Sequence, residues 1–205
     1  EFGKLIVVLF ENKDLIQRTA CIPDDQFIRG DAPMSKSEVR ALSVLKLNCD
    51  ADSIVYDVGA GTGSVSIELA LRAVDGTVYA IERDHDSIEL IKENRKRFKV
   101  PNLIPVEGLA PEALDDLPAP THVFIGGSSG NLKDIISCIL KKNPHVRIVM
   151  NAVTLETISE ILDVIKSFNL IEEETICLSV DRTRKIGRYH LMDSQNPVYI
   201  NVVRG

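Results

Sequence analysis

Three glycines at alternate positions, Gly59, Gly61 and Gly63, carry the clearest chemical signal in the chain, and the carboxylate of Asp57 stands just ahead of them. The apolar run SIVY precedes the segment DVGAGTGSVSIEL, which continues into a helix-forming stretch. Glycine has no side chain, so such a turn can bend sharply and let a ligand approach the backbone. The spacing predicts a ligand loop between a strand and a helix, where open parallel sheets bind their ligands.

Two classes of cofactor use a loop of this kind. Dinucleotides favour G-x-G-x-x-G or G-x-G-x-x-A, with the pyrophosphate on the amides of the following helix. Counting from Gly59 puts Ser64 in the sixth place, and counting from Gly61 puts Ser66 there, so this pattern fits imperfectly. The acid Asp57 suits a ligand with a positive centre and an amino group, because opposite charges attract, and it suits a pyrophosphate poorly.

Further ligand candidates follow the later strand-like runs. Glu82 ends the run TVYAIE, nineteen residues after Gly63, where a carboxylate can accept hydrogen bonds from both ribose hydroxyls. Gly126 and Gly127 end the run THVFIGG and leave the crevice open. A tight turn without a ligand is the alternative for the loop, and a solvated strand end is the alternative for Glu82. In this order and spacing, the set predicts a bound nucleoside cofactor.

The elements that must position these residues alternate between β-branched runs and helical stretches. Strands are predicted over residues 53–59, 77–82, 102–108, 121–127 and 146–153, and helices over 64–73, 86–98, 111–117, 132–142 and 155–168. Such alternation predicts an α/β fold, with a mostly parallel sheet covered by helices on both faces. The runs EEETICLSV and NPVYINVV have no long helix between them, which favours an antiparallel hairpin at one edge and brings the sheet to seven strands.

The amino-terminal part is less regular. Residues 35–47 open with the capping-box pattern from Ser35 to Glu38 and continue with apolar positions at helical spacing, which predicts a helix capped by Ser35. The run KLIVVLF is strand-like but lacks a crossover helix, so it does not fit this sheet. Residues 1–20 are therefore interpreted as a remnant of an upstream domain or a linker, and residues 21–205 as the ligand-binding domain.

The composition restricts the partners. The chain has 205 residues, enough for one domain with a full core, and its 44% hydrophobic and 26% charged content is typical of a soluble globular protein. The net charge of -6, the lack of tryptophan and the 5% aromatic content disfavour a nucleic-acid partner. Four scattered cysteines form no C-x-x-C pair, and no apolar run could cross a bilayer, so we expect free thiols, no metal, no membrane and a cytoplasmic location.

The pattern acid-x-G-x-G-x-G resembles the first motif of class I S-adenosylmethionine-dependent methyltransferases, which have a Rossmann-like fold. A closer resemblance, over residues 21 to about 203, is to the decarboxylating cobalamin-pathway methyltransferases that act on carbon 15 of precorrin-6B. The segments that carry it are IPDDQFIRG, SKSEVRAL, DVGAGTGSVSIEL, YAIERD, EGLAPEAL, FIGGSSG, NAVTLET and NPVYI. IPDDQF and GGSSG are not general methyltransferase features. The family often has GGSGG where this chain has Ser129 before Gly130, which departs from the pattern.

This resemblance implies S-adenosylmethionine as the cofactor, methylation of carbon 15, loss of carbon dioxide from the carbon-12 acetate arm, and a homotetramer. In related two-domain enzymes a module that methylates carbon 5 lies upstream, which fits residues 1–20. For Ala110, helix packing is the alternative role. The predicted cofactor contacts are Ser35, Asp57, Gly59, Ala60, Gly61, Thr62, Gly63, Glu82, Gly108 and Ala110.

The implied substrate is a tetrapyrrole with many carboxylates, which an acidic protein can hold only on a local cationic surface. The segment DRTRKIGRYH provides one, and arginine binds carboxylates bidentately, although a solvated basic hairpin is the alternative. Thr154 is either a substrate contact or a helix cap. The predicted substrate contacts are Gly126, Gly127, Asn151, Thr154, Arg182, Arg184, Lys185 and Arg188.

No residue is assigned as a general acid or base, and His190 is a candidate by type alone. Methyl transfer from a sulfonium is an in-line displacement that needs alignment more than it needs a metal. Two other functions stay open at this point: a methyltransferase of the same fold that acts on RNA or protein, and a nucleoside-binding module without turnover.

Overall fold

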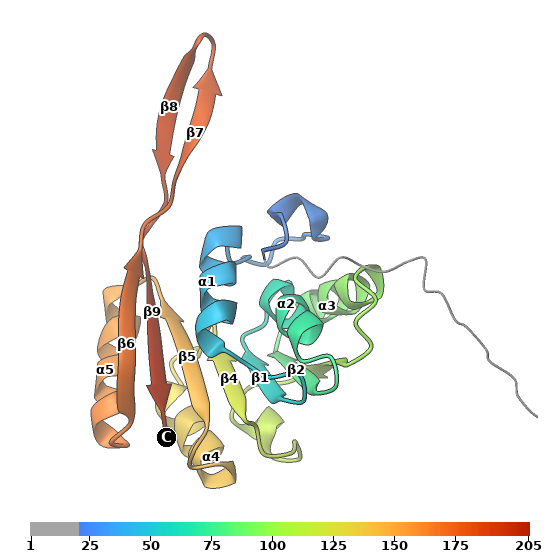
Figure 1. Ribbon diagram of the computed structural model, residues 1–205, viewed down its shortest axis with the longest axis vertical. Helices are drawn as coiled ribbons and strands as arrows, with labels where there is room; N and C mark the ends of the chain where they lie inside the picture. The colour runs from blue at the N-terminus through green and yellow to red at the C-terminus, as the bar shows by residue number, and fades with distance from the viewer. Residues whose placement is uncertain (1–20) are drawn as a thin grey trace, which may run out of the picture.

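The computed structural model describes residues 21–205, so the strand-like run at 4–10 and the proposed remnant at 1–20 lie outside the described residues. A seven-stranded sheet with the order β3-β2-β1-β4-β5-β9-β6 forms the centre of the molecule (Figure 1). Its strands are β1 (Ile54–Val58), β2 (Thr77–Glu82), β3 (Leu103–Glu107), β4 (His122–Ile125), β5 (Arg147–Ala152), β6 (Ile171–Leu178) and β9 (Val198–Arg204).

The sheet is parallel from β3 to β5, and only β9 runs antiparallel to both of its neighbours. The predicted α/β class with a mostly parallel seven-stranded sheet is therefore confirmed. The antiparallel strand was expected at the edge of the sheet, and that detail is wrong: β9 lies one position inside, because β6 takes the edge and the chain returns between β5 and β6. In that position the backbone groups of β9 pair on both sides.

Helices cover both faces of the sheet, and each face has its own apolar core because side chains alternate along a strand. Val55 of β1 packs in one core, with side chains of α1 (Ser37–Leu47), α2 (Ser64–Arg72) and α3 (His85–Arg97). Tyr56 packs in the other core, with α4 (Leu132–Lys142) and α5 (Leu155–Ser167). Two short 3-10 helices are η1 (Asp24–Gln26) and η2 (Glu112–Leu114), so the helix predicted over 111–117 is a single turn.

The prediction that Ser35 caps the first helix is wrong. Helix α1 begins at Ser37, and its N-cap is Lys36, which makes no side-chain capping hydrogen bond. The backbone carbonyl of Ser35 instead accepts a hydrogen bond from Nη1 of Arg40 at 2.7 Å. The first backbone hydrogen bond of the helix runs from the amide of Arg40 to the carbonyl of Lys36 at 2.8 Å, so the cap lies one residue after the predicted one.

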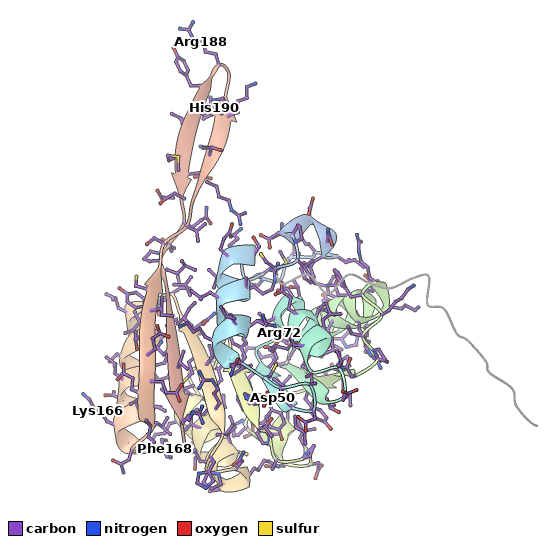
Figure 2. The ribbon with its side chains drawn as sticks, viewed as in Figure 1. Asp50, Arg72, Lys166, Phe168, Arg188 and His190 are labelled. Carbon is purple, nitrogen blue, oxygen red and sulfur yellow. The ribbon has the colours of Figure 1, made fainter. Side chains whose placement is uncertain are left out.

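A two-stranded ribbon, β7 (Asp181–Ile186) and β8 (Tyr189–Ser194), projects from the ends of β6 and β9, away from the helices (Figure 1). We call residues 181–194 the arm. All of its strand residues are exposed, and Arg188 and His190 lie toward its far end (Figure 2). The sequence predicted a basic connection here but not its two strands.

Candidate active site

A cavity of about 850 Å³ lies at the carboxyl ends of β1, β2, β4 and β5, where the sequence predicted the ligand crevice. Ligand pockets commonly have volumes of about 300–1,000 Å³. The cavity wall brings together twelve of the predicted site residues: Ser35, Asp57, Gly59, Ala60, Gly61, Glu82, Gly108, Ala110, Gly126, Gly127, Asn151 and Thr154. Thr62, Gly63 and the four basic residues of the arm are not part of this wall.

The glycine loop has the conformation that its composition suggests. Gly59, Gly61 and Gly63 have φ angles of +74°, +54° and +75°, in the region that side chains disfavour. The amides of Gly59 and Ala60 both donate to the carbonyl of Ile81, at 3.0 and 3.1 Å. A Cβ atom on Gly59 would lie 2.7 Å from the carbonyl oxygen of Gly127. The loop is therefore held between β2 and the β4–α4 loop.

Thr62 and Gly63 support this loop from behind. The buried carbonyl of Thr62 accepts a hydrogen bond from Nδ2 of Asn94, on α3, at 3.0 Å. Gly63 is the N-cap of α2, and a Cβ atom there would meet the side chain of Ile91 at 3.0 Å. Both residues shape the loop without facing the cavity.

Asp57 is fully buried at the end of β1 and belongs to the cavity wall. Its Oδ2 accepts a short hydrogen bond from the hydroxyl of Ser66, but its Oδ1 has no hydrogen-bond partner within residues 21–205. Burial raises the pKa of the carboxyl to about 7; the Ser66 hydrogen bond opposes this rise, and the charge of Glu82 adds to it. An unpartnered acceptor in a cavity wall fits a ligand that brings a cationic donor.

Glu82 contacts the glycine loop with one carboxylate oxygen and the residues after β2 with the other. Its Oε2 accepts from the amide of Gly61 at 2.9 Å, and its Oε1 accepts from the amides of Arg83 and Asp84 at 2.8 and 3.0 Å. The sequence predicted a ribose contact here and missed this loop contact. A carboxylate has about four acceptor positions, so a ribose hydroxyl can still bind.

The opposite side of the cavity is formed by β5 and α5. Asn151 donates through Nδ2 to the hydroxyl of Ser43 at 2.9 Å, and this hydroxyl donates to the carbonyl of Val39 at 2.8 Å. Thr154 accepts a hydrogen bond from the amide of Thr157 at 3.2 Å and is the N-cap of α5. The capping role of Thr154 is therefore confirmed, and its side chain is exposed at the cavity.

Sequence reasoning missed several charged residues of the cavity wall: Lys36, Arg83, Glu156 and Glu160. Lys36 and Arg83 are the cations of this wall within the described part of the chain. Both directly follow predicted site residues, Ser35 and Glu82, and this adjacency is the signal that could have found them. Basic side chains are therefore available inside the cavity as well as on the arm.

The arm places its basic residues elsewhere. Arg182, at its base, forms ion pairs with Glu38 and, at 3.7 Å, with Asp24. His190 and Arg188 lie out along the arm, away from the sheet (Figure 2). No histidine belongs to the cavity wall among residues 21–205, so His190 does not contact the cavity of its own chain.

We expect the Asp57→Asn variant to unfold at a higher temperature than the wild type at pH 8 when no ligand is bound. The pKa of Asp57 is raised from 3.8 to about 7 in the folded state, because the charged carboxylate is disfavoured when it is buried. The wild type is therefore most stable below about pH 3.8, and it loses this stability as the pH rises through 7 and the buried carboxyl ionises. Asparagine keeps the acceptor for Ser66 without the charge. Thermal unfolding from pH 4 to 8 measures the difference, which should shrink toward pH 4; an equal difference at every pH would contradict the assignment.

The described residues contain no group of three or more His, Cys, Asp or Glu side chains that could hold a metal ion. Within the same part of the chain, every helix is too short or too polar to cross a bilayer.

The strand order, the inserted antiparallel strand, the glycine loop after β1 and the acid after β2 define a Rossmann-like methyltransferase, a class that uses S-adenosylmethionine. The family model described as precorrin methyltransferase domain matches residues 26–204. The chain belongs to this precorrin methyltransferase family.

Individual relatives align with nearly the whole length of this chain. The probable cobalt-precorrin-6B C(15)-methyltransferase (decarboxylating) of Pyrobaculum calidifontis is 37% identical over 89% of this chain and 94% of its own. The solved structure of a precorrin-6Y C5,15-methyltransferase from Geobacter metallireducens has a TM-score of 0.83 and 38% identity, over 90% of this chain and 97% of its own. A precorrin-8W decarboxylase structure from Methanobacterium thermoautotrophicum has a TM-score of 0.82 and 34% identity, over 89% and 98%.

Proposed function

We propose that this chain transfers a methyl group from S-adenosylmethionine to carbon 15 of precorrin-6B, or of its cobalt form, and removes the carbon-12 acetate carboxyl as carbon dioxide. The observation that carries the proposal is the family match over residues 26–204, together with a cavity whose wall holds an unpartnered buried carboxylate oxygen. A curated relative with 37% identity is named a probable cobalt-precorrin-6B C(15)-methyltransferase (decarboxylating). RNA-modifying and non-catalytic functions have no comparable support.

The cofactor would bind along the glycine loop, with Asp57 opposite its cationic end and Glu82 at the ribose. Gly108 and Ala110 would border the adenine, and Ser35 would close the site from the other side. The bound cofactor supplies the methyl group on a positively charged sulfur. The chain's own contribution is to align that group with the substrate carbon and to exclude water.

Decarboxylation needs a carboxylate next to a ring that can accept its electrons, and the tetrapyrrole provides that ring. The wall of the cavity contains apolar side chains, among them Phe124, Ile125 and Met150. A carboxylate in such surroundings loses hydration, which raises its free energy before carbon dioxide leaves. We assign no general acid or base among the described residues.

The proposal is tested by incubating the protein with precorrin-6B and methyl-labelled S-adenosylmethionine and measuring the mass of the tetrapyrrole. We expect a gain of one labelled methyl group and a loss of carbon dioxide. A protein that binds the cofactor but leaves the tetrapyrrole unchanged would have a different substrate. Transfer of label to RNA or protein in parallel incubations would favour the alternative methyltransferases.

We also propose that basic residues of the arm hold carboxylates of the substrate. The double variant Arg184→Ala, Lys185→Ala should raise the KM for the tetrapyrrole about tenfold, because each lost charge-assisted contact weakens binding. Its Kd for S-adenosylmethionine should not change, since neither residue belongs to the cavity wall. Lys166→Ala, at the far end of the molecule from the arm, is the control (Figure 2). Steady-state kinetics measure the KM of both variants. An unchanged KM in the double variant would show that Arg184 and Lys185 are solvated residues without a role in substrate binding.

The arm also supports a homotetramer. It exposes the apolar side chains of Ile186, Tyr189, Leu191 and Met192 on a ribbon that projects from the sheet (Figure 1). Apolar surface of this kind is typical of a contact between protein chains. Light scattering measures the mass of the assembly, and we expect the mass of four chains.

We further propose a cytoplasmic location. We also propose that residues 1–20 belong to an upstream domain or linker and that residues 21–205 are the methyltransferase domain.

A further inference from the structure

The motif IPDDQF, which marks the family resemblance, begins a segment of irregular backbone that reaches the cavity. We call residues 22–36 the strap. Its last residues, Pro33, Met34, Ser35 and Lys36, form part of the cavity wall. The carbonyl oxygen of Pro33 would lie 3.0 Å from a Cβ atom placed on Gly61, so the strap lies directly against the glycine loop. The strap belongs to no strand of the sheet, so other contacts must hold it in place.

Arg40 of α1 supplies three of these contacts. It is fully buried, and its Nη1 donates to the carbonyl of Ser35 at 2.7 Å and to Oδ1 of Asp24 at 3.1 Å. Its Nη2 donates to the carbonyl of Ile22 in a short hydrogen bond. Its Nε donates at 2.6 Å to Glu68 of α2, which also accepts from the amide of Ile22 at 3.1 Å. One side chain therefore ties both ends of the strap to α1 and α2.

A second buried side chain ties the middle of the strap to the glycine loop. Asn94 of α3 has no exposed surface and exchanges two hydrogen bonds with the backbone of Ile28, at 2.8 and 3.0 Å. The same side-chain amide donates to the carbonyl of Thr62 at 3.0 Å. The strap and the loop thus share a polar anchor on α3, in addition to the apolar packing of the buried Ile22 and Phe27 in the core.

Buried ion pairs are an inefficient way to stabilise a core, because the desolvation of the charges offsets much of their attraction. The Arg40 guanidinium donates hydrogen bonds to both ends of the strap, so its main effect is to fix the position of this segment. We propose that Arg40, with Asp24 as its partner, is a positioning residue that holds the strap against the glycine loop and so shapes the wall of the cofactor cavity. This inference rests on the proposed function only in taking S-adenosylmethionine as the ligand.

The test compares Asp24→Ala with Glu173→Ala. Asp24 forms ion pairs with Arg40 and Arg182, and Glu173 likewise pairs with Arg147 and Arg204. Neither carboxylate belongs to the cavity wall, but Asp24 lies on the strap and Glu173 does not. Titration calorimetry of S-adenosylmethionine should show a Kd about tenfold higher for Asp24→Ala, because the strap loses its charged contact with Arg40. Glu173→Ala should stay within about twofold of the wild type, which is the usual scatter of neutral surface changes.

The variant Arg40→Lys adds a stronger test, because lysine keeps the charge but loses the fork that reaches both ends of the strap. It should raise the KM for the cofactor more than Asp24→Ala does and leave kcat at saturating cofactor nearly unchanged. If Arg40→Lys does not fold, the cofactor affinity of Asp24→Ala alone tests the proposal. Wild-type cofactor affinity in Asp24→Ala, or an equal loss in Glu173→Ala, would overturn the proposal. If the wild type itself binds no S-adenosylmethionine, the proposed function fails instead.

Discussion

The Gly59→Ala variant is expected to bind S-adenosylmethionine about 100-fold more weakly than the wild type, because backbone strain and a steric clash each cost about 1–3 kcal/mol. Gly59 has a φ angle of +74°, and a Cβ atom there would lie 2.7 and 2.9 Å from the carbonyl oxygen and amide nitrogen of Gly127. Both atoms belong to the backbone, so the methyl group can be accommodated only if the two loops move apart. That movement would displace the loop that the cofactor is proposed to contact. Calorimetric titration of the folded variant measures the loss.

Gly187→Ala is a control for backbone strain introduced away from the cavity. Gly187 lies in the turn of the arm with a φ angle of +59°, and a Cβ atom there has nothing within 4 Å. The substitution therefore carries backbone strain without a clash, at a distance from the cavity. Its affinity for the cofactor should equal that of the wild type. Wild-type affinity in Gly59→Ala as well would show that the loop tolerates a side chain and does not closely contact the ligand.

The Glu82→Ala variant should also lose about 100-fold in cofactor affinity, since hydrogen bonds to a charged group contribute about 1.5–3 kcal/mol each. The substitution removes the acceptor of three backbone amides, those of Gly61, Arg83 and Asp84. It also removes the proposed acceptor for the ribose hydroxyls. Loop geometry and ligand contact are lost together, so we expect the Kd of S-adenosylmethionine to rise while the protein still folds.

Glu107 offers a matched control for Glu82. The two residues are partners in the register of β2 and β3, so both carboxylates follow the same edge of the sheet. Glu107, however, is exposed, pairs with His85 and is absent from the cavity wall. Glu107→Ala should therefore bind the cofactor as the wild type does. Equal losses in the two variants would point to a general effect of negative charge at this edge.

Local patterns in the sequence were enough to determine the fold class. β-Branched runs of six to eight residues predicted β1 to β5, and the strand at residues 77–82 matches β2 (Thr77–Glu82). The helix predicted over 132–142 likewise matches α4 (Leu132–Lys142). Periodicity and glycine spacing depend on neighbours along the chain, which the sequence displays directly. For the same reason, the position of the ligand loop after β1 could be predicted.

Contacts between distant segments could not be predicted in this way. The capping pattern at Ser35 suggested a cap one residue before the observed one, and the bounds of the two strands of the arm were not predicted. Gly59 packs closely against the backbone of Gly127, which follows a different strand of the sheet.

By itself, then, the sequence determined the order of strands and helices, the flexible glycine turn and the two acids that flank it. Tertiary structure alone decided that Asp57 is buried with one oxygen unpartnered, that Glu82 accepts a hydrogen bond from the loop amide of Gly61, and that Arg40 binds the strap. The physical reason is that burial and hydrogen-bond partners depend on which distant residues pack together, and local spacing does not encode that packing.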